Sequence, residues 1–115
     1  MRDIIVIKAD KFAHEVYRVS RLFPKEEIYG LTSQLRRSVL SVVLNVIEGF
    51  ARNRNLEYLH FLEIAYGSLK ESKYLLHFCY KEDILTKKDY TVLISIAEEI
   101  GKMIWDRMKR IKNIK

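Results

Sequence analysis

The chain has 115 residues, of which 49% are hydrophobic and 31% charged; this indicates one globular domain over residues 1–115 and excludes a disordered chain. Its single cysteine, Cys79, excludes an internal disulfide, and no stretch approaches the roughly 20 uncharged apolar residues of a membrane span. The formal net charge of +6 attracts polyanions, of which nucleic acid is the usual one. The apolar run over residues 4–7 is too short for a signal peptide, so we expect a soluble, cytoplasmic protein.

The first two helices are expected over residues 8–22 and 30–50. In the first, apolar side chains recur at steps of three or four residues, which places them on one face; they are Phe12, Val16, Val19 and Leu22 or Phe23. Pro24 ends this helix, because the residue before a proline disfavours helical geometry. In the second helix the same spacing defines an apolar stripe made of Leu31, Leu35, Val39, Val42 and Val46.

Two further helices follow a short basic turn. We expect the third over residues 55–80 with Asn55 as its N-cap, and the fourth from a cap at Thr86 or Asp89 to about Ile111. Four glycines and one proline leave little material for hairpin turns, which argues against a sheet. Amphipathic helices with short connections bury their apolar stripes by packing antiparallel around one core. The sequence therefore predicts an all-α fold, an antiparallel up-down four-helix bundle.

Three segments carry a family resemblance. Residues 23–38 read FPKEEIYGLTSQLRRS, residues 45–52 read NVIEGFAR, and residues 61–71 read FLEIAYGSLKE. They resemble the motifs FPKEE-x-YGLTSQLRRA, N-I-A-E-G-x-x-R and F-L-x-I-A-x-G-S-L-x-E of the ribosomal-RNA intervening-sequence proteins, a four-helix-bundle family. One departure lies in the second helix, where Val43 replaces the proline of the family's S-I-P-S-N. A backbone hydrogen bond should then be restored and the helix straightened.

The resemblance implies a four-helix protomer that assembles into a ring, which in related proteins is a homopentamer. Some members of the family are encoded inside insertions in large-subunit ribosomal RNA genes. The related accessory variability determinant proteins of diversity-generating retroelements bind nucleic acid and a reverse transcriptase. The partners that the resemblance implies are thus further copies of the chain, RNA or DNA, and a reverse transcriptase or another protein.

A polar stripe runs beside the apolar stripe of the second helix, at the same three- and four-residue spacing. It consists of Gln34, Arg37, Ser41, Asn45, Glu48 and Arg52. One interpretation is that it lines the central passage of the ring or binds phosphates. The other is that residues such as Asn45 and Glu48 hydrogen-bond across helices or subunits and set their register. We interpret Gln34, Ser41, Asn45 and Glu48 as such polar contacts.

Basic residues form three sets, which we interpret as phosphate-binding positions. The sets are Arg36 with Arg37, Arg52 with Arg54, and the C-terminal run that begins at Arg107. Phosphate contacts need only flexible cationic ends, so these residues suffice for binding without strong sequence specificity. The sequence has no zinc-finger, RNA-recognition or helix-turn-helix signature. The alternative is that the C-terminal cations complement the dipole of the last helix. The candidate nucleic-acid-binding residues are Arg36, Arg37, Arg52, Arg54, Arg107, Lys109 and Arg110.

The sequence contains no catalytic constellation and no set of metal ligands. Glu57 and His60 have the Glu-x-x-His spacing of di-iron bundles, but there is no second such motif. Cys79 and His77 are two residues apart, so on a helix they point to different faces. We therefore expect a non-catalytic protein, without cofactor or metal, that serves as a nucleic-acid-binding accessory or scaffold. The rival hypothesis is a protein-interaction adaptor whose charge serves only solubility.

Overall fold

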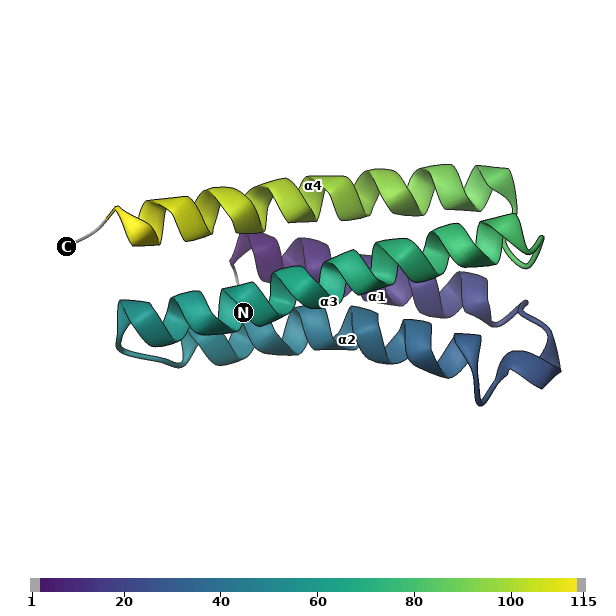
Figure 1. The fold of residues 1–115 in the computed structure, drawn as a ribbon, viewed down its shortest axis with the longest axis horizontal. Helices are drawn as coiled ribbons and strands as arrows, with labels where there is room; N and C mark the ends of the chain where they lie inside the picture. Colours follow the sequence, from purple (N-terminus) through teal and green to yellow (C-terminus); the bar gives the residue numbers. More distant parts are fainter. Residues whose placement is uncertain (1–2, 114–115) are drawn as a thin grey trace.

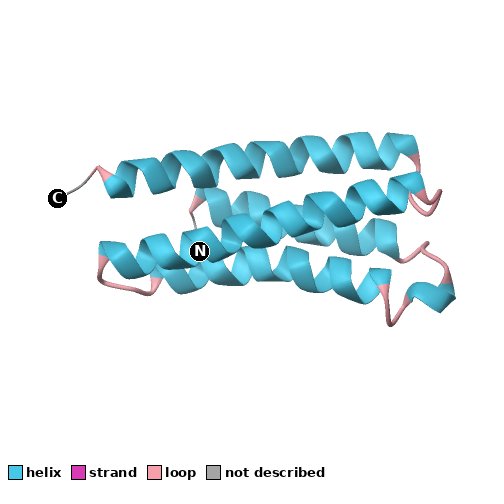
Figure 2. Cartoon of the chain, in the orientation of Figure 1, coloured by secondary structure: helices cyan, strands magenta, loops and turns pink. Residues whose placement is uncertain are grey.

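Four long helices run antiparallel in the computed structural model, which describes residues 3–113 (Figure 1). They are α1 (Ile4–Ser20), α2 (Leu31–Phe50), α3 (Asn55–Lys81) and α4 (Lys87–Lys112), with a short 3-10 helix, η1 (Lys25–Glu27), before α2. The part of the chain that is described contains no strand (Figure 2). The predicted all-α four-helix bundle is confirmed. None of the helices within residues 3–113 is long and apolar enough to cross a membrane.

Helix α1 begins four residues earlier than the apolar spacing predicts, at Ile4 instead of residue 8. The carboxylate of Asp3 caps it by accepting hydrogen bonds from the backbone N–H groups of Ile5 (3.0 Å) and Val6 (3.3 Å). Both capped residues are buried, so the first turn adds to the core. The expected start was wrong because the apolar run over residues 4–7 is the first turn of the helix.

The turns between helices differ from the sequence prediction in small ways. Arg54, in extended conformation and without a side-chain cap, is the N-cap of α3, and Asn55 is the first helical residue, so the predicted cap was wrong. Thr86 caps α4, and its hydroxyl accepts a hydrogen bond from the N–H of Asp89 at 3.1 Å. In the turn before it, Asp83 has a φ of 61°, a left-handed conformation that Asp tolerates better than most residues.

One apolar core runs along the bundle and is built from the predicted stripes. On α2, the last four residues of the predicted stripe are at most 1% exposed: Leu35, Val39, Val42 and Val46. Each such side chain contributes about 1.5–3 kcal/mol when fully buried. At the end of α1, the prediction left two residues open, and Phe23 is buried whereas Leu22 is 84% exposed. All four helices supply large buried side chains, among them Phe12, Leu35, Leu62, Leu69, Leu76, Ile100 and Ile104.

Helix α2 is continuous through the position where the family has a proline. Val43 occupies it and is 8% exposed, while the next residue, Leu44, is 59% exposed. Leu40 on the same helix, and Ile4 and Ile7 on the adjacent α1, are also exposed. These four exposed residues, Ile4, Ile7, Leu40 and Leu44, are called the apolar surface below.

Candidate functional site

The fold brings basic residues from distant parts of the sequence to one end of the bundle. Arg52 and Arg54 lie in the turn between α2 and α3, and Lys109 and Arg110 lie in the last turns of α4, which reach the same end (Figure 1). These four residues are called the basic end. Arg54, Lys109 and Arg110 are exposed and form no side-chain hydrogen bond or ion pair with the other described residues.

Arg107 connects the basic end to the rest of the bundle. Its guanidinium donates hydrogen bonds to the Tyr58 hydroxyl (2.8 Å) and to Asp3 Oδ1 (3.0 Å), and it lies 5.8 Å from the Phe50 ring centroid. Burial works against its charge, but the hydrogen bonds outweigh burial and hold the pKa of Arg107 above its ordinary value. Only 19% of its side chain is exposed. This geometry favours a structural role, in which Arg107 joins α4 to the start of α1 and to α3.

Arg36 and Arg37 are separated from the basic end, because they lie in the first two turns of α2. Arg36 donates hydrogen bonds to Ser20 Oγ (2.8 Å) and to the carbonyl of Tyr17 (3.4 Å), and its guanidinium stacks 4.5 Å from the Tyr17 ring centroid. It therefore binds the C-terminal turn of α1. Arg37 is exposed and, together with Gln34 and with Glu71 of α3, lines a surface depression.

Arg52 is partly engaged within the protomer. Its guanidinium pairs with Glu48 at 3.0 Å, one helical turn away, and lies 4.9 Å from the ring centroid of Phe61. An exposed pair of this kind contributes about 0.3–0.5 kcal/mol, so a phosphate can displace the carboxylate at little cost. Arg52 thus remains available for an anion, unlike Arg107.

The polar stripe of α2 divides into interhelix and intrahelix contacts. The hydroxyls of Ser41 and Ser68 on α3 share a hydrogen bond of 2.7 Å. The Asn45 amide donates to the carbonyl and hydroxyl of Ser41 (2.8 and 3.0 Å), within α2. Glu48 pairs with Arg52 in the turn that follows the helix. Gln34 is exposed. Among the described residues, the stripe therefore hydrogen-bonds to α3 only at Ser41, and Arg52 adds a cation–π contact with Phe61 of α3.

A second hydroxyl contact between these helices was not anticipated. The Ser72 hydroxyl lies within hydrogen-bonding distance of two acceptors, Ser38 Oγ (2.8 Å) and the carbonyl of Ser68 (2.9 Å), and donates its single proton to one of them at a time. Both Ser38 and Ser72 are buried. Because each hydroxyl has a partner, the helices approach closely without leaving a polar group unsatisfied. The small residues Ser68 and Ser72, four apart on α3, are the sequence signal for this close approach.

The described residues hold no obvious reaction centre. Within residues 3–113, no three His, Cys, Asp or Glu side chains are grouped as metal ligands. Cys79 is fully buried, and burial, with a smaller contribution from the charge of Glu27, raises the pKa of its thiol to about 11. A thiol in that state is a poor nucleophile at neutral pH.

These features define a class of protein, an elongated four-helix bundle with a group of basic residues, the basic end, at one of its two ends. The chain belongs to a particular family of that class, because the family model described as 23S rRNA-intervening sequence protein matches residues 2–106. The resemblance seen in the sequence is thus confirmed.

A solved structure shares the fold. It is that of a protein of unknown function from the S23 ribosomal protein family of Bacteroides thetaiotaomicron, with a TM-score of 0.86 and 20% sequence identity. The alignment covers 92% of this chain and 99% of that one. No curated protein matches this chain.

Proposed function

We propose that this protein binds RNA or DNA through phosphate contacts at its basic end, without strong sequence specificity and without catalysing a reaction. The observation that carries the proposal is the convergence of Arg54, Lys109 and Arg110, all exposed, at one end of the bundle. The acids Asp3 and Glu48 at this end are already paired with Arg107 and Arg52. Exposed cations on a rigid surface attract the phosphate backbone by releasing its counterions.

The net positive charge of the basic end is small in a single protomer. Lys112 adds a further cation in the last turn of α4, and the exposed acids Glu57 and Asp106 offset part of the positive charge. Repeating the same end in several copies multiplies the phosphate contacts and raises affinity through avidity. The proposal therefore includes assembly into a homo-oligomer, the ring that the family resemblance implies.

The apolar surface supports this assembly. Ile4, Ile7, Leu40 and Leu44 are 40–59% exposed on two adjacent helices, and burying them against another copy removes apolar area from water. The polar stripe residues Gln34 and Arg37, also on α2, are exposed and available for contacts between subunits.

The test compares two double variants of the same helix that remove equal charge. K109Q/R110Q alters the basic end, and K87Q/K88Q alters two exposed lysines in the first turn of α4, at the other end of the bundle. Binding of fluorescently labelled single-stranded RNA and duplex DNA is followed by anisotropy across a salt series, with the oligomer mass measured on the same samples.

We expect K109Q/R110Q to weaken binding and to lower the slope of log affinity against log salt by about one for each phosphate that is no longer neutralised. K87Q/K88Q should have a clearly smaller effect. Equal effects from both variants would overturn the assignment to the basic end. An oligomer that binds neither nucleic acid at low salt would overturn nucleic-acid binding itself and favour the protein-interaction adaptor.

A further inference from the structure

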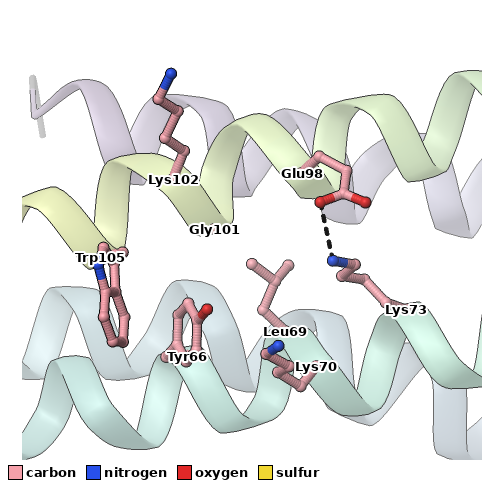
Figure 3. Close-up of a pocket in the computed structure, with 8 residues that line it drawn as sticks. All are labelled: Tyr66, Leu69, Lys70, Lys73, Glu98, Gly101, Lys102 and Trp105. Atoms are coloured by element: carbon pink, nitrogen blue, oxygen red, sulfur yellow. Dashed lines mark hydrogen bonds and ion pairs between the residues drawn. The ribbon is translucent and has the colours of Figure 1, made fainter.

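A groove between α3 and α4 begins one helical turn before Lys109 of the basic end and combines two aromatic rings with three lysines (Figure 3). Its volume is about 320 Å³, near the lower limit of ligand-binding pockets, so it suits one small unit of a ligand. The residues that line it are Tyr66, Leu69, Lys70 and Lys73 from α3 and Glu98, Gly101, Lys102 and Trp105 from α4.

One end of the groove is aromatic. The Tyr66 and Trp105 rings pack against each other between the two helices, with centroids 5.6 Å apart and ring planes tilted by 43°. Trp105, the only tryptophan of the chain, is 48% exposed. Gly101 leaves the space open, because a Cβ there would lie 3.3 Å from Leu69 and 4.0 Å from Tyr66. A half-exposed tryptophan beside a tyrosine offers a flat apolar face to a planar ring.

The charges of the groove favour an anion. Lys73 is neutralised by Glu98 at 3.0 Å, an ion pair that bounds the other end of the groove. Lys70 lies 5.4 Å from the Tyr66 ring centroid, and Lys102 is exposed on the rim; neither has an acidic partner among the described residues. In Figure 3 the Lys102 side chain extends away from the groove, so Lys70 is the unneutralised cation beside the two rings. A nucleotide of a single strand carries the complementary groups, a planar base and a phosphate.

We propose that this groove binds one unpaired nucleotide of a single-stranded nucleic acid, with its base against Trp105 and Tyr66 and its phosphate near Lys70. Stacking on an aromatic ring tolerates every base, which agrees with binding that lacks strong sequence specificity. A duplex cannot use the groove, because its bases are already stacked and paired. The inference rests on the proposed function and adds a preference for single strands.

The test uses the intrinsic fluorescence of Trp105. A twelve-nucleotide oligouridylate, an oligothymidylate of the same length and a DNA duplex are titrated into the full chain at low salt. We expect both single strands to quench the fluorescence and the duplex to quench it far less. The variant K70Q keeps the tryptophan, and quenching should need several-fold more oligonucleotide.

A second pair of variants measures affinity by anisotropy. Replacement of Trp105 (W105A) should lower single-strand affinity by about 5- to 150-fold, the effect of removing one base–aromatic stack, and leave duplex affinity nearly unchanged. The matched control is Tyr74→Ala, which removes an exposed aromatic ring that lies on α3 and does not line the groove. Circular dichroism checks that each variant keeps its helices.

The outcomes separate this inference from the proposed function. One outcome is that K109Q/R110Q weakens binding while W105A does not, and the fluorescence stays constant. The nucleotide site in the groove is then refuted, and phosphate binding at the basic end is supported. If W105A weakens single-strand and duplex binding equally, the groove does not read unpaired bases and the inference also fails. If no oligonucleotide binds at all, both proposals fall.

Discussion

Replacing Gly49 by alanine should destabilise the bundle, although alanine is the better helix former. Gly49 is buried in α2 where α3 passes close by, and an added Cβ would lie 2.8 Å from Cδ1 and 3.2 Å from Cε1 of the Tyr58 ring. The ring cannot easily move away. It packs against Phe50 with centroids 5.3 Å apart, and its hydroxyl accepts the hydrogen bond from Arg107.

The size of the effect follows from two opposing contributions. Forcing a methyl group into a filled contact costs about 1–3 kcal/mol, whereas alanine recovers about 1 kcal/mol of helix propensity. The net expectation for G49A is a loss of about 1 kcal/mol. It rises towards about 2 kcal/mol when the displaced Tyr58 also loses its bond to Arg107.

Gly67 provides the matched control. It lies exposed inside α3, and an added Cβ would meet nothing within 4 Å, so G67A should gain about 0.5–1 kcal/mol from propensity alone. Urea unfolding followed by far-UV circular dichroism, at one protomer concentration, measures both variants. If G49A proves as stable as G67A, the close approach of Tyr58 does not limit packing and the reasoning fails.

Three further predictions concern interior groups. R107A should lose about 2 kcal/mol of unfolding free energy, because it leaves Asp3 and Tyr58 without their charged partner. A loss near zero in urea unfolding would show that solvent screens the ion pair between Arg107 and Asp3. S72A should lose about 1 kcal/mol in the same assay, since it removes the hydroxyl bonded to Ser38, and an unchanged midpoint would contradict this. The Cys79 thiol should resist thiol reagents at neutral pH until the chain unfolds. The pKa of the thiol is about 9.0 in the unfolded chain and about 11 in the folded chain, so the free energy of unfolding should fall as the pH rises between these values. C79A should not show this contribution to the loss of stability.

The sequence by itself determined the number, type and approximate extent of the helices. Apolar spacing of three and four residues places Leu35, Val39 and Val46 on one face whatever the partner helix is, so the stripe can be read locally. The ends were less predictable. The start of α1 depends on Asp3, and the carboxylate that caps the helix is also bound by Arg107, 104 residues away along the chain.

Only the tertiary structure decided which charged residues remain available to a ligand. Nothing in the sequence distinguishes Arg36 and Arg107 from the other cations. In the fold, both guanidinium groups hydrogen-bond to residues of α1 or of its N-cap. The fold also brings Arg54 to the same end as Lys109 and Arg110.

The aromatic groove arose in the same way. Trp105 and Tyr66 belong to two different helices, and nothing in the residue spacing of either helix shows that their rings pack against each other. Helical periodicity depends on residues that are close together in the sequence, so it can be recognised from the sequence alone. The meeting of charges and rings depends on how the helices pack, because side chains distant in sequence come within contact distance only when the core has formed.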